Sequence, residues 1–337
     1  MLVIVADRSE RAKPPTIAEV AGRAGVSIAT VSRVVSGQGP VRDVTRRRVQ
    51  EAIAATGWMA NPAARQLAGG RPDEIVLAVA VADQRDFAAD PHYARVLAGA
   101  YEEAARQGLS VSVHVARFGR LAALAPFGTR RHLGAIVVNA SPEEAALIGS
   151  GGRPVVSMGA AGPSVPSVDP ENGTGASAAV EHLLAAGRKR IATIAGPATN
   201  PCARERLAAY RARTQAAGRA GIELTTDFTR PSAAQAARHL LQAVPDLDAV
   251  FVASDLMATA VLQVLQASGR RVPDDVAVVG FDNSPPAAMT TPALSTVHQP
   301  VEQLAGLAVR TLTDGIGRHP LDQRLPTHLV LRSSSAA

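Results

Sequence analysis

The sequence predicts a small all-α head that begins with a helix-turn-helix, joined to a larger α/β body of two lobes. Three observations predict this fold class. Two short helical segments flank a glycine near the start, the net positive charge is confined to the first 71 residues, and short apolar runs alternate with alanine-rich segments over the rest of the chain.

The first helix is expected to begin after Thr16, whose side chain can cap it while Glu19 returns a hydrogen bond to the amide of the cap. Gly25 ends this helix, because glycine readily adopts the left-handed conformation that a sharp exit needs. Its apolar stripe consists of Ile17, Val20, Ala21 and Ala24.

Ser27 is expected to cap a second helix with a buried stripe of Val31, Val34 and Val35. The outward positions at its N-terminal end lie where helix-turn-helix proteins carry base-reading residues. These positions are Ile28, Ala29, Ser32 and Arg33. An ordinary helical hairpin in a small core is the alternative interpretation.

The charge distribution favours a head that binds nucleic acid. Residues 1–71 hold 11 Lys and Arg against 5 Asp and Glu, whereas residues 72–337 hold 24 of each. A basic head on a neutral body is typical of a module that displaces counterions from phosphates. Four arginines at the start of a third helix, built on Val49, Ala52 and Ile53, are expected to contact the DNA backbone, with a solvated face as the alternative. They are Arg42, Arg46, Arg47 and Arg48.

A further short helix is predicted where the head meets the body. Asn61 can cap it, Pro62 fits its first position, and Gly69 and Gly70 end it. A helix this short is unstable alone, so we expect it to order only on DNA or beside its copy. Leu67 is then an exposed apolar side chain that can wedge into a minor-groove step, although a plain linker is the alternative.

Seven segments in order resemble the LacI/GalR family of bacterial transcriptional regulators, and the resemblance covers residues 15–333. The segments lie at 16–33, 61–67, 168–173, 182–188, 191–197, 254–258 and 279–282. The resemblance implies a homodimer that binds a pseudo-palindromic operator, and a periplasmic-binding-protein-like sensor domain whose effector is a sugar. The DNA-binding candidates are Thr16, Ser27, Ile28, Ala29, Thr30, Ser32, Arg33, Asn61, Ala64, Arg65 and Leu67.

The same resemblance sets the expected domains. They are a disordered extension at 1–14, a helix-turn-helix DNA-binding domain at 15–60, a hinge helix and linker at 61–71, and the sensor at 72–333. Family topology has the chain cross between lobes three times. Lobe 1 is therefore expected at about 72–169 and 300–328, and lobe 2 at about 170–299 and 329–333.

The pattern of the body supports such a sensor. Short apolar or β-branched runs lie at 75–82, 110–116, 134–139, 154–158, 191–196, 249–253 and 276–281. Their alternation with helical segments predicts parallel sheets covered by helices on both faces, with a ligand crevice beyond the carboxyl ends of the strands.

Six residues are candidates for the effector site. Asp282 follows a strand-like run, and its carboxylate can accept two hydroxyl hydrogen bonds, although a turn cap is the alternative. The resemblance places Arg206 and Phe228 in the cleft, where a planar guanidinium binds hydroxyls and an aromatic face stacks on a sugar. Their alternatives are a surface arginine and a core phenylalanine. Ser254 stands where many relatives carry asparagine.

Phe87 and Gln299 complete the six. Phe87, with the weaker candidates His92 and Tyr93, follows the first sensor strand, and Gln299 begins the last crossing, where hinge packing is the alternative. Cys202 is expected to be a small packing residue, with a place near the ligand as the alternative because it lies four residues before Arg206.

Other chemistry has little support. The eight histidines show no metal-ligand spacing and Cys202 is alone, so we expect no cofactor, no metal, no disulfide and a cytoplasmic protein. The apolar run at 1–6 is too short for an export signal, and no run is long enough to span a membrane. A sugar-binding transport receptor without DNA binding is the alternative function, and a sugar-modifying enzyme comes third. The short polar end at 333–337 favours a dimer, while the effector, the operator and the direction of the response stay open.

Overall fold

The structure is a computed structural model that describes residues 15–36, 39–58, 72–123 and 132–336 of the chain. They divide into two compact units, with the boundary between Pro72 and Asp73.

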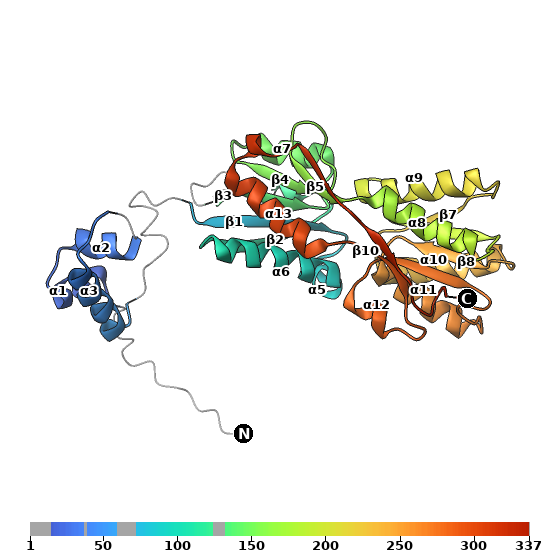
Figure 1. Cartoon of the computed structure of the whole chain (residues 1–337), viewed down its shortest axis with the longest axis horizontal. Coiled ribbons are helices and arrows are strands. Elements are labelled where there is room, and N and C mark those ends of the chain that lie inside the picture. Colours follow the sequence, from blue (N-terminus) through green and yellow to red (C-terminus); the bar gives the residue numbers. More distant parts are fainter. Residues whose placement is uncertain (1–14, 37–38, 59–71, 124–131, 337) are drawn as a thin grey trace, which may run out of the picture. The chain divides into compact units, whose positions relative to one another are not determined.

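The head unit contains the three expected helices, α1 (Ile17–Ala24), α2 (Ile28–Ser36) and α3 (Asp43–Thr56) (Figure 1). The predicted capping box is confirmed: the Glu19 amide donates to Thr16 Oγ1 at 3.3 Å, and the Thr16 amide donates to Glu19 Oε2 at 3.0 Å. Gly25 ends α1 with φ of 61°, as expected. Val20, Val31 and Val49 are fully buried, so each helix contributes one side chain to the centre of this small core.

Lobe 1 of the body is a parallel sheet with the strand order β11-β5-β4-β3-β1-β2. Its strands are β1 (Glu74–Val81), β2 (Ser110–Arg117), β3 (His132–Val138), β4 (Val155–Met158), β5 (Ser167–Pro170) and β11 (Asp322–Leu325). Alternate residues of β1 face opposite layers, because Ile75 and Leu77 pack towards α6 (Pro91–Arg106) and α13 (Val301–Asp314), whereas Val76 and Ala78 pack towards α7 (Pro142–Gly149). The short helices are α5 (Gln84–Ala89), η1 (Leu121–Ala123) and η2 (Ile316–Arg318).

Lobe 2 repeats this arrangement with the strand order β12-β10-β9-β8-β6-β7. Its strands are β6 (Ile191–Ala195), β7 (Ile222–Thr225), β8 (Ala249–Val252), β9 (Ala277–Asp282), β10 (Ser295–His298) and β12 (His328–Val330), of which β12 alone is antiparallel to its neighbour among these described strands. One core layer packs under α10 (Arg230–Ala243) and α11 (Asp255–Ala267), and the other under α8 (Asn172–Ala185) and α9 (Pro201–Ala216). A short helix, α12 (Pro285–Met289), follows β9.

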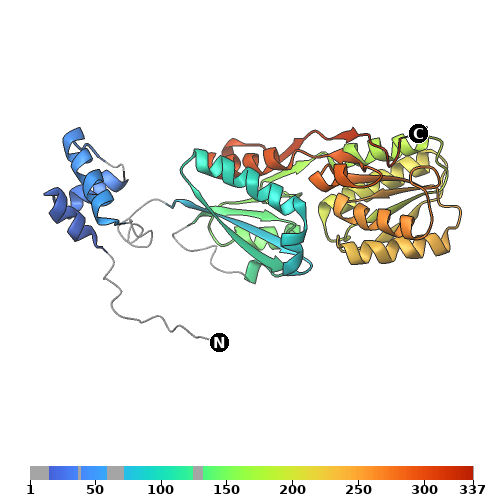
Figure 2. The same cartoon turned by 90° about the horizontal axis from the view of Figure 1, so that it is seen from below.

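The chain passes between the two sheets three times, from β5 to α8, from β10 to α13, and from β11 to β12 (Figures 1 and 2). The third passage comes earlier than expected, because His328 already pairs with His298 in the second sheet, whereas lobe 1 was expected to run to about residue 328. The body also extends past residue 333. Ser334 is fully buried and its hydroxyl donates to the carbonyl of Val278 at 2.6 Å, which fastens the polar tail to lobe 2.

The seven apolar runs all form strands, but the alternation did not reveal β5, β7, β10, β11 or β12. These strands have only three or four residues each, and polar side chains interrupt them. Among the helices that the structure describes, none has the length and apolar character that a membrane crossing requires.

Candidate DNA-binding face and effector cleft

The outward positions of α2 form one exposed surface, which we call the reading face: Ile28, Ala29, Ser32 and Arg33. Ile28 is 50% exposed although it is a large apolar residue. Ser27 and Thr30 lie at the start of the same helix and satisfy each other, because the Thr30 amide donates to Ser27 Oγ at 3.2 Å and their hydroxyls lie 2.9 Å apart. Capping of α2 therefore occupies Ser27 and Thr30, and the side chains of the reading face are exposed beside them.

The arginines of α3 approach the turn of the motif. Arg42, Arg47 and Arg48 are exposed, and Arg46 is half-buried. A side chain added at Gly25 would place its Cβ 2.6 Å from Nη2 of Arg48, so the bare turn leaves room for that guanidinium. The remaining DNA-binding candidates Asn61, Ala64, Arg65 and Leu67, with the predicted hinge helix, lie outside the described residues, as does the expected extension at 1–14.

The body has a cavity between its lobes, beyond the carboxyl ends of the strands, where the alternation predicted a crevice. We call it the inner chamber. Five of the six effector candidates line it, namely Arg206, Phe228, Ser254, Asp282 and Gln299. Other lining residues come from both lobes: Asp90, His92, Tyr93, Val138, Asn139, Met158, Val168, Asp169, Pro170, Asn200, Cys202, Val301 and Leu304.

Asp282 is the last residue of β9 and is buried, with φ of 128°. This backbone conformation is strained for a residue other than glycine, and such strain is found more often at functional sites. Gln299 Nε2 donates to Oδ1 of Asp282, and the Asp255 amide donates to Oδ2 at 3.2 Å. Burial raises the pKa of Asp282, although Arg206 acts in the opposite direction. The carboxylate is thus held in place and faces the chamber.

Asp255, whose amide donates to Asp282, was not among the residues predicted for the site. It is fully buried, and its Oδ2 accepts the Ser284 amide at 2.7 Å while Oδ1 accepts the Thr296 hydroxyl at 2.6 Å. Burial and the neighbouring charge of Asp282 raise the pKa of Asp255. Its place in the sequence, directly after Ser254, is the signal that could have drawn attention to it.

Arg206 is buried and points into the chamber from α9. Its Nε donates to Asn172 Oδ1 at 2.8 Å, Nη1 donates to the carbonyl of Ala253 at 2.6 Å, and the guanidinium lies 3.6 Å from the ring centre of Phe281. Two hydrogen bonds and an aromatic face therefore fix the orientation of this cation. A surface arginine would have none of these features.

Phe228 and Ser254 line the chamber in different ways. Phe228 has φ of 67°, and its ring packs so close to Gly196 that an added Cβ there would lie 2.2 Å from a ring carbon. Ser254 caps α11, because its hydroxyl accepts the Met257 amide at 3.3 Å. That oxygen accepts one hydrogen bond from the protein, and its O–H can still donate to a ligand.

Phe87 does not line the chamber. It stacks on the ring of Tyr93 with centroids 5.5 Å apart, and Tyr93 is the residue of this pair that lines the cavity. The weaker candidates His92 and Tyr93 do line the wall, and burial lowers the pKa of His92 to about 4. The position of these residues after the first sensor strand therefore predicted the part of the chain that lines the chamber. It did not identify which aromatic side chain faces the chamber.

Direct polar contacts connect the lobes around the chamber. Asn200 Nδ2 at the start of α9 donates to Oδ1 of Asn139, which follows β3, at 3.2 Å. Arg95 of α6 donates to the carbonyls of Asp282 and Gln299 at 2.9 and 3.2 Å. These contacts join segments far apart in the sequence, so periodicity could not reveal them.

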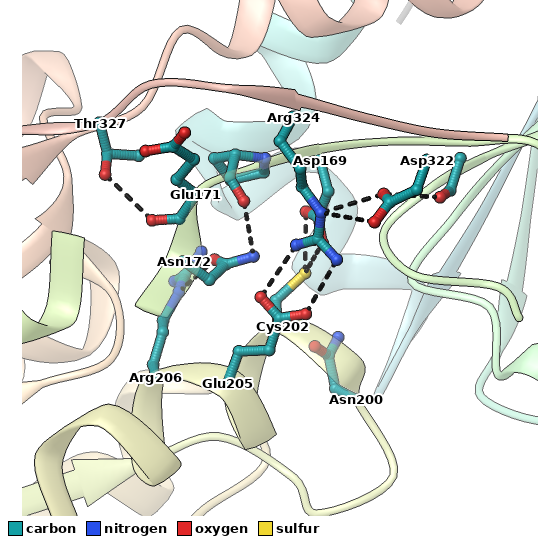
Figure 3. A network of polar contacts seen from close by, with 12 residues as sticks. Asp169, Glu171, Asn172, Asn200, Cys202, Glu205, Arg206, Asp322, Arg324 and Thr327 are labelled. Atoms are coloured by element: carbon teal, nitrogen blue, oxygen red, sulfur yellow. Dashed lines mark hydrogen bonds and ion pairs between the residues drawn. The ribbon is translucent and has the colours of Figure 1, made fainter. Parts of the chain in front are cut away.

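A second connection surrounds Cys202 (Figure 3). Arg324 of β11 reaches Asp169 of β5 at 3.3 Å and binds Glu205 of α9 through two hydrogen bonds of 2.9 and 3.1 Å. The Cys202 thiol donates to Asp169 Oδ1 at 3.4 Å, and burial raises the pKa of this thiol. The Cys202 thiol is thus a hydrogen-bond donor in this network, and Arg324 bridges the lobes. In the parts of the chain that the structure describes, no three His, Cys, Asp or Glu side chains are grouped to hold a metal ion.

The fold and these two sites define a protein with a helix-turn-helix head and a two-lobed ligand-binding body. Residues 16–61 match the bacterial regulatory proteins of the lacI family, and residues 180–335 match the periplasmic binding protein-like domain. The HTH-type transcriptional regulator CelR of Thermobifida fusca is 38% identical over 342 residues, covering 96% of this chain and 99% of the relative. The ribose operon repressor of Bacillus subtilis (strain 168) is 30% identical and covers 91% and 93%.

Solved structures agree with these matches. A CelR-cellobiose complex has a TM-score of 0.73 at 36% identity and covers 95% of this chain and 99% of that one. The lac repressor dimer bound to operator and the anti-inducer ONPF has a TM-score of 0.84 at 28% identity and covers 96% and 100%.

The chain belongs to the lacI family of bacterial regulatory proteins, and it is a DNA-binding transcriptional regulator. The fold class and the family expected from the sequence are both confirmed. The relatives named here are regulators and not transport receptors, so the alternative function gains no support.

Proposed function

We propose that this protein is a repressor that binds a pseudo-palindromic operator as a homodimer and is controlled by a sugar in the cleft between its lobes. One observation carries the proposal: Asp282, Gln299 and Arg206 meet in the inner chamber of a chain that also has a basic head with an exposed reading face. The similar lac repressor is described as a dimer on its operator, and CelR is described with cellobiose, which supports both halves of the proposal.

In the head, the reading face on α2 enters the major groove, and Thr16, Ser27 and Thr30 lie near the DNA backbone at the helix starts. Arg33 supplies the guanidinium fork that best recognises guanine. Asn61, Ala64, Arg65 and Leu67, where the sequence predicts a hinge helix, serve the minor groove, with Leu67 as the wedge.

In the cleft, the Asp282 carboxylate accepts sugar hydroxyls and Arg206 donates to them, while the Phe228 ring stacks on an apolar sugar face. Gln299 holds Asp282 in position, and Ser254 contributes to the wall. Phe87 acts through the Tyr93 ring that it supports. The protein works in the cytoplasm and leaves its ligand chemically unchanged.

Control follows from the connections between the lobes. A sugar that contacts both walls changes the preferred angle between the lobes, because it competes with or adds to bonds such as Asn139–Asn200. Coupling of about 1–3 kcal/mol between two sites changes the affinity of one of them about 5- to 150-fold. The cleft therefore needs only a modest preference for one lobe arrangement to control DNA binding.

The test is a titration of a duplex, selected by the protein from a random pool, over a range of salt concentrations and with a panel of neutral sugars. We expect salt-dependent binding with a slope set by the phosphate contacts of the head, and at least one sugar that shifts the affinity. Absence of DNA binding would overturn the regulator, and binding that no ligand of the cleft alters would overturn the sensor.

A further inference from the structure

A second cavity, which we call the outer chamber, adjoins the inner chamber and has no role in the function proposed above. It lies between α5 and the end of β2 in lobe 1 and the start of α10 and α11 in lobe 2. Asp90, Tyr93 and Phe228 line both chambers, so the two spaces meet at these three residues. The outer chamber has a volume of about 180 Å³ against about 80 Å³ for the inner one. A ligand confined to the inner chamber would leave the outer chamber empty.

The outer chamber is lined mainly by apolar surface. Phe118, Phe228 and Tyr93 supply aromatic faces, and the aliphatic wall consists of Ala82, Ala89, Pro231 and Leu256. An apolar enclosure with aromatic faces is suited to the flat hydrocarbon face of a sugar ring.

Three of its polar side chains make hydrogen bonds within their own lobes. Asp86 accepts the Asp83 amide at 2.8 Å, Asp227 accepts the Thr229 hydroxyl at 2.7 Å, and Arg230 donates to Gln263 at 2.8 Å. These hydrogen bonds hold the walls of the outer chamber in place.

The backbone is strained at Phe228, one of the residues where the two chambers meet. Phe228 has a left-handed backbone, and Gly196 gives its ring space that any other residue would fill. Strained backbone conformations of this kind are found more often at functional sites. Asp90 beside it accepts the His92 amide through Oδ1 at 2.9 Å, and its Oδ2 has no donor among the described residues. The junction therefore combines an aromatic ring with a carboxylate oxygen that can accept a hydroxyl.

Charge narrows the class of ligand. Across both chambers the described lining holds five carboxylates, from Asp86, Asp90, Asp169, Asp227 and Asp282. It holds two guanidiniums, those of Arg206 and Arg230, and each already makes hydrogen bonds with the protein. The lining therefore has no surplus of positive charge that would bind a phosphate or carboxylate group on a ligand.

We infer that the two chambers are consecutive subsites for a neutral disaccharide, with one ring at Asp282 and Arg206 and the second ring in the outer chamber. Phe228 stacks at the junction, and Asp90 accepts a hydroxyl hydrogen bond near the glycosidic link. The inference rests on the proposed function, since it names the class of sugar that the same cleft binds.

The test blocks the outer chamber and leaves the inner one unchanged. Ala89 is exposed at the end of α5 and lines only the outer chamber, so Ala89→Trp fills that space without disturbing a core. Ala88→Trp is the matched control, because Ala88 is also exposed on the same helix and lines neither chamber. Calorimetry measures binding of a panel of neutral disaccharides that includes cellobiose, of their constituent monosaccharides, and of the matching aldobiuronic acids.

We expect one disaccharide to bind the wild type at least about tenfold more tightly than either constituent monosaccharide or its acidic analogue. Ala89→Trp removes that preference and keeps the monosaccharide affinity, and Ala88→Trp retains both. Gly196→Ala, which displaces the Phe228 ring, lowers disaccharide affinity more than monosaccharide affinity.

Equal affinity for monosaccharide and disaccharide, preference for the acid, absence of binding by every disaccharide, or a disaccharide affinity that survives Ala89→Trp would each overturn the inference. The proposed function fails on different evidence, namely loss of DNA binding or of any ligand response. A wild-type protein that responds to a monosaccharide alone would keep the proposed function and refute the two subsites.

Discussion

The reading face of the head and the wall of the inner chamber differ in exposure and in the number of elements that form them. The reading face is exposed and comes from one helix, with four residues inside six consecutive positions. The chamber wall is buried, comes from both lobes, and depends on bonds such as Gln299 to Asp282 that join distant segments. The first site is a surface ready for a large partner, and the second is an assembled cavity whose shape changes when the lobes move. Substitutions should separate the two.

The largest effect is expected from Arg206→Ala. The variant loses a buried cation that two hydrogen bonds and the Phe281 ring hold in the chamber, and hydrogen bonds of charged groups contribute about 1.5–3 kcal/mol each. Effector affinity, measured by calorimetry, should fall about 100-fold while DNA affinity stays unchanged. Arg211→Ala is the control, since Arg211 lies on the surface of the same helix and pairs with Glu223. Unchanged effector affinity in Arg206→Ala would remove Arg206 from the site.

The reverse separation is expected from Arg33→Ala on the reading face. A guanidinium contact to a base edge contributes about 1–3 kcal/mol of discrimination, so affinity for the selected duplex should fall about tenfold or more. Effector binding should not change. Competition with duplexes altered one base pair at a time shows the loss at a single position of each half-site. A uniform loss across all sequences would instead assign Arg33 to the DNA backbone.

The difference between a site on one helix and a site assembled from distant segments also explains how much of each could be predicted from the sequence. The helix-turn-helix was readable because Thr16, Glu19 and Gly25 act through local spacing, and the structure reproduces that geometry. Asp282 was identified because it follows a strand-like run, and Arg206 was identified through the family resemblance. Asp90, Asn139, Asp169 and Asn200 were missed, since nothing local distinguishes a polar residue that faces a chamber from one that faces water. The stacking of Phe87 behind Tyr93 was likewise invisible, because both are aromatic and lie near the same strand.

A smaller effect is expected from Asp90, whose ionisation makes the stability of the protein depend on pH. Burial and the nearby charge of Asp282 raise the pKa of Asp90 from 3.8 to about 7. Between these values the folded protein keeps a proton that the unfolded chain has lost, so this carboxyl makes the folded state less stable as pH rises from about 4 to about 7.

Asp90→Asn should therefore flatten the fall in stability over that range, and its melting temperature should exceed that of the wild type by a few degrees near pH 7. Thermal scans of both proteins from pH 4 to 8 measure the difference. A constant difference at every pH would contradict a raised pKa.

The smallest effect is expected where the lobes meet outside the chamber. Glu205→Gln removes a partly exposed partner of Arg324, and exposed ion pairs contribute about 0–1 kcal/mol. Since Arg324 bridges the lobes, the variant should alter the ligand-induced change in DNA affinity by a factor of about two to five, with little change in melting temperature. Glu223→Gln, which breaks a pair within lobe 2, is the control. An equal effect of both variants would show that the bridge has no special part in coupling.

The most direct test of the account measures fluorescence anisotropy of the selected duplex with wild type and Asp282→Asn, each with and without the sugar that binds best. The account predicts that both proteins bind the duplex equally in the absence of sugar, and that sugar shifts the wild-type affinity about 5- to 150-fold while leaving the variant unmoved. A variant that responds to sugar as the wild type does would contradict the claim that the buried cleft controls the exposed head.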